Sequence, residues 1–333
     1  MTSQRSICLT GGAGYIGSHA CLALAARGVS PLTVDDLSTG SEDAVNWGPL
    51  VGLDIRETDR LATVLKKHSV DTVLHFAASA YVGESVENPQ KYYDNNVGGM
   101  LSLLNACKAA NVKTFVLSSS CATYGVPERV PVTESSLQNP INPYGRTKLI
   151  CEQMLHDYAS QSDMAYSILR YFNVAGADPS GALTERHDPE THLIPLTLFA
   201  AAGRIPKLTL FGGDYDTSDG SCVRDYVHVS DLVHGHMLAL EYLEDFGGSL
   251  IANLGSGQGV SNFEIIDMVE RLTGRQVPVE IAPRRLGDPP ELIADISHAR
   301  QRLGFQPQRS DLGTIVADAA HSFGVEAVHA ISA

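Results

Sequence analysis

Short runs of apolar and β-branched residues alternate with longer helical patterns over the first 170 residues of the chain. Such alternation is typical of βαβ units, in which helices connect parallel strands. The pattern predicts strands at 7–10, 32–34, 72–75, 114–118 and 165–170, and helices at 15–27, 61–68, 90–110 and 144–160. We therefore predict a doubly wound α/β fold, in which ligands bind beyond the carboxyl ends of the strands.

The alternation ends after Phe172. Residues 178–191 are rich in Pro, Gly and charged side chains, which predicts a long loop. Helices are predicted at 193–202, 230–244 and 261–273, the last capped by Ser261 or Asn262, and a short strand at 278–281. We predict a Rossmann-type domain over 1–174 and a smaller α/β lobe over 175–333, and leave open whether segments near 220–260 return to the first domain.

The composition narrows the classes of protein and partner. A chain of 333 residues exceeds the usual size of a single core, and 44% hydrophobic with 19% charged residues is typical of a soluble globular protein. We predict no transmembrane helix and no signal peptide. The net charge of −14 argues against nucleic acids and anionic membranes as partners. Six scattered cysteines without a C-x-x-C pair predict reduced thiols in the cytoplasm.

A glycine-rich turn connects the first predicted strand to the first predicted helix. It reads Gly11-Gly12-Ala13-Gly14-Tyr15-Ile16-Gly17, with the spacing G-x-x-G-x-x-G. Glycine is required where the backbone turns tightly and approaches a pyrophosphate, whose charge then rests on the helix N-terminus. We predict a dinucleotide site formed by Gly11, Gly14, Tyr15, Ile16 and Gly17.

Later strand ends carry residues suited to the rest of a dinucleotide. Asp35 and Asp36 follow the second strand, where a carboxylate accepts hydrogen bonds from ribose hydroxyls and repels a 2′-phosphate; this favours NAD over NADP. Asp54-Ile55 would place a short polar side chain against the adenine, with a turn or helix-cap role for Asp54 as the alternative. Phe76-Ala77 would let a cofactor pass closely.

The stretch Tyr144-Gly145-Arg146-Thr147-Lys148 is the most informative for chemistry. Pro143 marks a helix start, so Tyr144 and Lys148 stand at i and i+4 on one face. A free tyrosine has a pKa of about 10, which a nearby ammonium and a cationic nicotinamide would both lower. Ser118-Ser119-Ser120 ends the preceding strand, with hydroxyls suited to bond a substrate oxygen. We predict that Tyr144, Lys148 and Ser120 are catalytic, and that Ser118, Tyr144 and Lys148 lie at the cofactor.

These motifs resemble those of the UDP-glucose 4-epimerases, a family within the extended short-chain dehydrogenase/reductase superfamily. The likeness covers nearly the whole chain and is carried by residues 10–19, 81–86, 92–97, 118–125, 144–148, 170–173, 223–228 and 253–255. A generic dinucleotide-binding enzyme would not carry all of them. The resemblance implies an NAD-dependent isomerase that acts at carbon 4 of a UDP-sugar, and it implies a homodimer.

The family mechanism can be carried onto the residues present here. By resemblance, Tyr144 removes the proton of the carbon-4 hydroxyl while hydride passes from carbon 4 to NAD. The 4-keto sugar then turns about its phosphate linkage, and hydride and proton return to the other face. Ser120 aligns the oxygen, Lys148 holds the nicotinamide ribose and tunes Tyr144, and Asn95 and Tyr171 help to bind NAD.

The resemblance also implies contacts for the UDP-sugar. Asn173, Arg224 and Arg285 would bind the diphosphate, Phe211 would lie by the uracil, and Asp288 would accept from the ribose. Arginine suits phosphate because its planar donors bind bidentately.

Three features of the sequence leave the sugar itself open. His192, followed by Leu193, stands where many of these epimerases carry Asn before Leu-x-Pro, and both residues are predicted to contact substrate. Leu292 stands where Tyr or Cys often gates sugar size, which leaves N-acetylated sugars open. Residues 120–125 also resemble plant UDP-arabinose/UDP-xylose 4-epimerases, so a pentose remains an alternative.

The sequence fits a 4,6-dehydratase, a non-catalytic NAD-binding protein or a metal-binding protein less well than an epimerase. A 4,6-dehydratase of the same fold carries Asp-Glu after a Thr, whereas Cys121-Ala122 follow Ser120 here. A non-catalytic NAD-binding protein typically loses the Tyr or the Lys, and both are present. His234 and His236, at i and i+2 of a predicted helix, point apart, and no cluster of Cys and His has ligand spacing, so we predict no metal site.

Overall fold

The computed structural model describes residues 5–285 and 288–325, and it divides the chain into two compact units. Unit 1 contains the chain up to Gly125, Gln138–Arg170 and Val233–Ala252. Unit 2 contains Val126–Leu137, Tyr171–Leu232 and the chain from Asn253 onward. Residues 126–137 therefore belong to unit 2 rather than to the first domain predicted over 1–174, and Val233–Ala252 returns to unit 1, a possibility that the sequence left open.

Unit 1 is built on a seven-stranded sheet with the order β10-β6-β5-β4-β1-β2-β3. Its strands are β1 (Ile7–Thr10), β2 (Leu32–Asp35), β3 (Leu50–Gly52), β4 (Thr72–His75), β5 (Thr114–Ser120), β6 (Ala165–Tyr171) and β10 (Ser249–Leu254). The pairs β1–β2, β1–β4, β2–β3 and β4–β5 are parallel. Because β1 lies between β2 and β4, the winding reverses beside β1, where doubly wound folds bind ligands.

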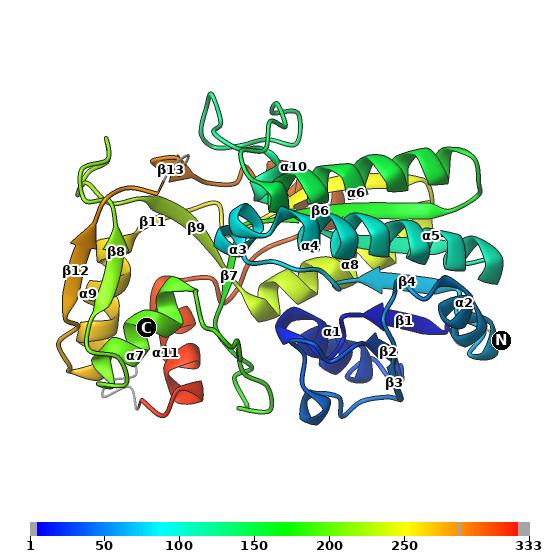
Figure 1. The fold of residues 1–333 in the computed structure, drawn as a ribbon, viewed down its shortest axis with the longest axis horizontal. Coiled ribbons are helices and arrows are strands. Elements are labelled where there is room, and N and C mark those ends of the chain that lie inside the picture. Colours follow the sequence, from blue (N-terminus) through cyan, green and yellow to red (C-terminus); the bar gives the residue numbers. More distant parts are fainter. Residues whose placement is uncertain (1–4, 286–287, 326–333) are drawn as a thin grey trace. The chain divides into compact units, whose positions relative to one another are not determined.

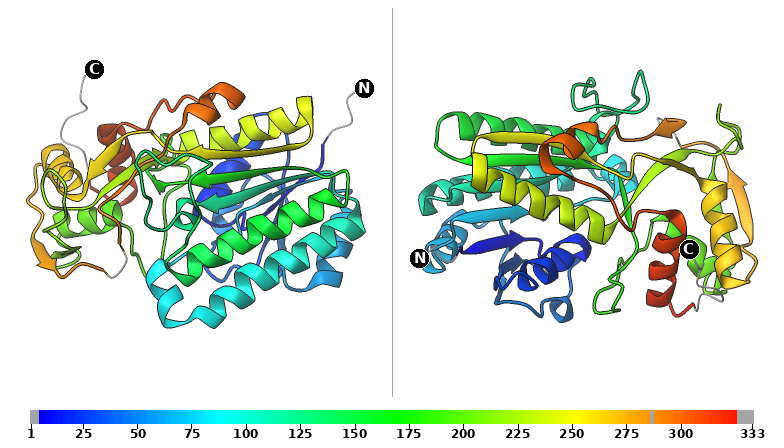
Figure 2. Two further views of the ribbon diagram at one scale, coloured as in Figure 1. Left: turned by 90° about the horizontal axis from the view of Figure 1, so that it is seen from above. Right: turned by 180° about the vertical axis from the view of Figure 1, so that it is seen from behind.

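Helices cover both faces of this sheet (Figures 1 and 2). On one face, α2 (Thr58–Lys67), α5 (Gly99–Ala110) and α6 (Pro143–Ser160) pack on the strands through a core that includes Leu61, Met100 and Leu155. α1 (Tyr15–Ala25) and α8 (Val229–Phe246) lie on the opposite face. Strands β1, β2 and β4 are buried along their full length, as expected for parallel strands covered on both sides.

The helix predicted at 90–110 is present as one uninterrupted helical run with a π-helical stretch inside it. It consists of α4 (Pro89–Tyr92), the π-helical segment η2 (Tyr93–Gly98) and α5. Short elements that the sequence pattern did not reveal are η1 (Glu42–Ala44), α3 (Val82–Glu87) and η3 (Cys121–Thr123). A π-helical turn inside a longer helix often marks a functional site.

Unit 2 contains two small sheets. In the first, β9 (Val223–His228) pairs with β11 (Gly259–Ser261), β13 (Glu291–Leu292) and β7 (Asn173–Ala175). In the second, β8 (Leu208–Phe211) is parallel to β12 (Val279–Ala282). Helices α7 (Leu193–Ala201), α9 (Asn262–Thr273) and α11 (Leu312–Ser322) share one core, and α10 (Ser297–Leu303) follows β13.

Local chemistry determines two boundaries in unit 2. Ser261 caps α9, because its Oγ accepts from the Glu264 backbone N–H and Glu264 accepts from the Ser261 N–H in return. This reciprocal pair decides between Ser261 and Asn262 as the cap. Residues 176–192 contain neither helix nor strand, which agrees with the predicted loop over 178–191. No helix in the described part of the chain combines the length and apolar character that a transmembrane segment requires.

Candidate active site

The glycine-rich turn follows β1 and leads into α1. Gly11 has a φ of +75°, and a Cβ there would lie 2.4 Å from the backbone nitrogen of Ala77. A Cβ on Gly17 would lie 2.1 Å from the carbonyl oxygen of Gly11. Gly14 is the N-cap residue, so Tyr15 and Ile16 lie in the first turn of α1, where backbone N–H groups lack helical acceptors. The predicted residues thus form a tight turn at a helix N-terminus, which is suited to an anion.

Asp35 ends β2 and holds this turn in place. Its Oδ2 accepts from the Ala13 N–H at 3.0 Å and its Oδ1 from the Leu37 N–H at 2.9 Å. Burial raises the pKa of Asp35, and these two hydrogen bonds oppose the rise. Asp36 is exposed, and its Oδ1 accepts from the Ser38 backbone at 2.9 Å. These two contacts are compatible with the ribose role predicted for Asp35, because each carboxylate oxygen can accept more than one hydrogen bond.

Asp54 makes local contacts that fit its alternative interpretation as a turn residue. Its carboxylate accepts from Arg56 Nε at 3.0 Å and from the Arg56 backbone at 2.9 Å. The hydrogen bonds from Arg56 lower the pKa of Asp54. Ile55 is buried in the core, where a Cβ on Gly99 would meet its Cδ1 at 2.9 Å. A contact of Asp54 and Ile55 with adenine stays a prediction.

Three further predicted cofactor residues lie on the segment after β4 or contact it. The backbone nitrogens of Phe76 and Ala77, just after β4, donate to the Thr10 carbonyl at 2.8 and 3.0 Å. Asn95 lies in the π-helical segment η2, and its Nδ2 donates to Ser79 Oγ at 3.0 Å. The segment after β4 therefore links the glycine turn to η2.

Tyr144 lies in the first turn of α6. Asn142 caps this helix by accepting from the Gly145 N–H at 2.8 Å, and Pro143 is its first residue. A Cβ on Gly145 would lie 2.4 Å from the carbonyl oxygen of Ala122. This close approach places the start of α6 against η3, the segment that directly follows Ser120. The structure thus brings the two predicted catalytic residues onto adjoining segments.

Lys148 is buried one helical turn after Tyr144. Its Nζ donates to the Ser118 carbonyl at 2.8 Å, which ties α6 to the end of β5. Burial lowers the pKa of Lys148. Ser118 Oγ is itself 2.8 Å from Nε2 of His236 on α8.

Ser120, at the end of β5, has a fixed hydroxyl. Its Oγ accepts from the Ala122 N–H at 3.1 Å, and its carbonyl accepts from Thr123 Oγ1 at 2.9 Å. A hydroxyl that accepts a backbone hydrogen bond keeps its own proton to donate. Ser120 is therefore suited to bond a substrate oxygen, as predicted.

A buried ionic network beneath this site was not predicted from the sequence. Glu152 Oε2 lies 2.7 Å from Nη2 of Arg170, and these side chains are only 5% and 4% exposed. Ser119 Oγ donates to Glu152 Oε1 at 2.5 Å, and Gln138 Nε2 donates to Oε2 at 3.0 Å. Arg170 also donates to the Tyr124 hydroxyl at 3.1 Å. The network joins β5, α6 and β6 to one another next to Ser120.

In unit 2, the residues predicted to bind UDP occupy β9 and the segments around it. Arg224 Nη2 donates to Asp288 Oδ1 at 2.5 Å, so the predicted phosphate and ribose contacts pair with each other. Leu292 is the register partner of Arg224 between β13 and β9. The Arg285 guanidinium lies 4.2 Å from the centre of the Phe211 ring.

The other predicted contacts are located as follows. Tyr171 is the last residue of β6, and Asn173 begins β7, opposite Tyr226 of β9. Arg284, next to Arg285, was not predicted: its guanidinium carbon lies 4.3 Å from the centre of the Tyr215 ring, and its Nε donates to Asp214 Oδ1 at 2.6 Å.

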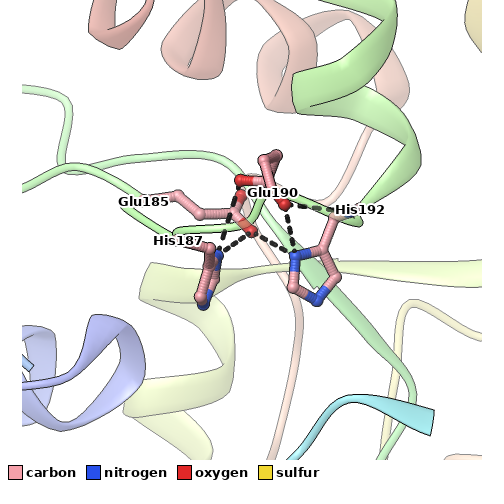
Figure 3. Close-up of side chains that lie close together, drawn as sticks. All are labelled: Glu185, His187, Glu190 and His192. Atoms are coloured by element: carbon pink, nitrogen blue, oxygen red, sulfur yellow. Dashed lines mark hydrogen bonds and ion pairs between the residues drawn. The ribbon is translucent and has the colours of Figure 1, made fainter. Parts of the chain in front are cut away.

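His192 is the N-cap residue of α7, and Leu193 is the first residue of that helix. The Nδ1 atom of His192 lies 2.9 Å from Oε1 of Glu190. Glu185 and His187 lie beside these two residues (Figure 3), and the ligand-type atoms of the four side chains all lie within 4.8 Å of one another. This mixed group of carboxylates and imidazoles was not predicted, because the absence of a metal site was inferred from Cys and His spacing alone.

Comparison with known proteins places the chain among relatives of known chemistry. Residues 7–255 match the model of the NAD dependent epimerase/dehydratase family. The chain belongs to this family. It is 52% identical over 316 residues to a UDP-glucose 4-epimerase from Rhizobium meliloti (strain 1021), which covers 95% of this chain and 96% of that protein.

Solved structures of such epimerases have the same fold. The structure of UDP-glucose 4-epimerase from Brucella ovis in complex with NAD matches with a TM-score of 0.95 and 54% identity, over 97% of this chain and 99% of that one. A UDP-glucose-4-epimerase from Stenotrophomonas maltophila with bound NAD and formylated UDP-arabinopyranose matches with a TM-score of 0.92 and 41% identity, over 96% and 97%. These matches confirm the predicted resemblance to UDP-glucose 4-epimerases and the doubly wound fold.

The glycine turn of this NAD dependent epimerase/dehydratase family member fits a dinucleotide. Side chains at Gly11 and Gly17 would fill the turn, whereas a Cβ on Gly14 would meet only the Gly11 carbonyl, at 3.5 Å. The backbone at Gly14 is therefore open to a ligand, and Asp35 closes the turn from the end of β2. This arrangement accommodates a pyrophosphate between the turn and the start of α1.

Replacing Gly17 with Ala is expected to lower both NAD content and stability. The new Cβ would overlap the Gly11 carbonyl, and such overpacking costs about 1–3 kcal/mol. NAD released from denatured protein and the melting temperature measure the two effects. The matched control is Gly52→Ala, because a Cβ on Gly52 at the end of β3 meets no atom within 4 Å. Wild-type NAD content in Gly17→Ala would contradict the assigned turn.

Proposed function

We propose that this protein is an NAD-dependent UDP-sugar 4-epimerase that interconverts UDP-glucose and UDP-galactose. The observation that carries the proposal is the arrangement of Ser120, Tyr144 and Lys148 in unit 1. Gly145 brings the Tyr144 end of α6 against the segment after Ser120, and Lys148 is bonded to the end of the same strand. A hydroxyl donor, a phenol and a buried amine are thus gathered beyond the carboxyl end of β5, in the unit that holds the glycine turn.

Each of the three residues has a distinct role in the proposed reaction. Tyr144 takes the proton from the sugar's carbon-4 hydroxyl and returns it after the sugar has turned. Ser120 donates a hydrogen bond to the same oxygen and is held in place by the Ala122 N–H. Lys148 stands one turn from Tyr144 and stabilises its phenolate as a fixed cation. NAD, when bound, supplies a reversible acceptor for the hydride of carbon 4.

The UDP portion is proposed to bind to residues of unit 2. Arg224 and Arg285 supply guanidinium groups, which bind phosphate oxygens through paired donors despite the overall charge of −14. Asp288 holds the Arg224 side chain and can also accept from a ribose hydroxyl. Asn173 and Phe211 are the further contacts proposed, with His192 and Leu193 at the start of α7.

A pentose is the second candidate for the sugar. The relative from Stenotrophomonas maltophila was solved with a formylated UDP-arabinopyranose, and it is 41% identical to this chain. Leu292, proposed to limit sugar size, is buried beside Arg224 in the β9–β13 ladder. Its bulk does not by itself separate a hexose from a smaller pentose.

A panel of UDP-sugars tests this function. The protein, purified without added NAD, is incubated with UDP-galactose, UDP-arabinose and UDP-N-acetylgalactosamine, and the products are separated by chromatography. We expect conversion of UDP-galactose to UDP-glucose without added cofactor, because NAD is regenerated in every cycle. Faster conversion of UDP-arabinose would favour the pentose alternative. Protein that binds NAD but converts none of these sugars would be a non-catalytic NAD-binding protein, and the proposal would be rejected.

Two properties of the whole protein are also proposed. All six cysteines are buried thiols, which suits a reducing compartment and supports a cytoplasmic location. The homodimer rests on the resemblance to UDP-glucose 4-epimerases alone. Light scattering coupled to size-exclusion chromatography measures it directly, since a monomer has a mass of 35.6 kDa.

A further inference from the structure

A group of two carboxylates and two imidazoles gathers in the loop that precedes α7. It consists of Glu185, His187, Glu190 and His192, which we call the Glu/His group, and all four lie within unit 2 (Figure 3). Eight consecutive residues supply all four side chains, with the spacing E-x-H-x-x-E-x-H. One short segment therefore folds around a common point.

Four distances within the Glu/His group are close to those between ligands of a tetrahedral metal ion. Nδ1 of His187 lies 3.3 Å from Glu185 Oε1 and 3.5 Å from Glu190 Oε2. Nδ1 of His192 lies 3.1 Å from Glu185 Oε1 and 2.9 Å from Glu190 Oε1. In a tetrahedral zinc site with bonds of about 2.0–2.1 Å, neighbouring ligand atoms lie about 3.3 Å apart. The four distances lie on either side of this value, the two to Glu190 end on different oxygens of its carboxylate, and the four ligand atoms together lie within 4.8 Å of one another.

The environment of Glu185 is an independent sign of a missing ligand. Glu185 is 3% exposed, and among the described residues its buried Oε1 accepts no hydrogen bond, although two imidazole nitrogens lie near it. A short contact between a carboxylate oxygen and an imidazole nitrogen without hydrogen-bond geometry is expected where both atoms point toward a metal ion. A buried carboxylate requires compensation of its charge, because desolvation strongly disfavours it when isolated. Two carboxylates, two neutral imidazoles and one divalent cation sum to zero.

We propose that the Glu/His group binds one divalent transition-metal ion, with Zn²⁺ as the best match. Imidazole nitrogens favour zinc and its neighbours over Mg²⁺ and Ca²⁺, which take oxygen ligands. Four protein ligands make a closed, structural site. The ion would fix the loop to the start of α7, where His192 is the cap residue. A ring bound through Nδ1 carries its proton on Nε2, so His192 would present a donor of fixed tautomer.

An ion-pair network is the competing explanation. The charges of such a network also sum to zero when both histidines are protonated. Burial lowers the pKa of His192, but the carboxylates of Glu185 and Glu190 raise it to about 10. The network places two positive rings side by side, however, since the His187 and His192 ring centres are 4.7 Å apart. Metal binding removes that repulsion.

Metal analysis of the full-length protein, produced without a polyhistidine tag, separates the two explanations. We expect about one Zn²⁺ per chain after dialysis against metal-free buffer. Zinc added at 100 times its dissociation constant to chelator-stripped protein should raise the melting temperature by about 4 °C. Stripped protein loaded with Co²⁺ should show the intense visible absorption of a tetrahedral ion, a readout that does not depend on catalysis.

Two variants provide the comparison. Glu185→Gln keeps the shape of the side chain but removes a ligand charge, and it should weaken zinc binding by at least about 100-fold, beyond the 10–100-fold effect of outer-shell changes. Asp188→Asn changes an exposed carboxylate of the same loop outside the Glu/His group and should bind zinc like the wild type. Wild-type protein without zinc and without a thermal response would overturn the proposal. So would equal binding by Glu185→Gln.

Discussion

Replacing Tyr144 with Phe is expected to reduce the turnover of UDP-galactose by about 10²–10⁴-fold, the range for loss of a general acid–base. The substitution removes only the hydroxyl, and the ring keeps its edge-on contact with Tyr92 at 6.5 Å between centres. NAD binding should be retained, because the glycine turn and Lys148 are untouched. Product formation and NAD content per chain, measured on the same preparation, test both parts.

Tyr158→Phe is the matched control for this experiment. Tyr158 lies on the same helix, α6, and its hydroxyl donates to Asn105 in an exposed position away from the candidate site. Its loss should leave turnover within about twofold of the wild type, since it takes no part in the proposed chemistry. If Tyr144→Phe were as active as Tyr158→Phe, Tyr144 would not be the base.

Replacing Arg170 with Met is expected to lower the free energy of unfolding by about 3–5 kcal/mol, because it leaves the buried carboxylate of Glu152 without its cation. The loss includes the hydrogen bonds of Arg170 to Glu152 and to the Tyr124 hydroxyl. Urea unfolding, followed by circular dichroism, gives the change in free energy. Because Ser119 bonds the same carboxylate next to Ser120, we also expect reduced activity in the folded variant.

Two further variants show whether an uncompensated charge is the cause. The double variant Arg170→Met with Glu152→Leu removes both charges and should recover part of the lost stability. Glu280→Gln breaks the exposed pair with Lys207 and should change stability by at most about 1 kcal/mol. A double variant less stable than Arg170→Met alone would contradict the explanation.

The parts of this molecule that the sequence predicted depend on local chemistry. The strands β1 and β4 match their predicted bounds, because short β-branched runs between turns have few alternatives. The candidate site was also predictable in outline: carboxyl ends of parallel strands share one edge, so Ser120 and the start of α6 were expected near each other.

Features that depend on contacts distant in sequence were not predictable. Glu152 and Arg170 are 18 residues apart on a helix and a strand, and nothing in either local pattern marks them as partners. The place of residues 126–137 in unit 2 was not predictable for a similar reason, because the Val132 N–H donates to the carbonyl of Ile293, far along the chain. Nothing in the predicted loop over 178–191 indicated that the side chain of Glu185 is buried.

The π-helical turn at Tyr93–Gly98 makes the helix over residues 89–110 sensitive to the deletion of a single residue. A π-helical turn holds one residue more than an α-helical turn, so removing one residue there would let the helix run on regularly. Every side chain on the amino-terminal side would then rotate by about 100° relative to α5. Asn96, which now reaches both Ser79 and Thr147, could not keep both partners. Among homologous chains, insertions and deletions should therefore avoid this segment even where the adjacent loops vary in length.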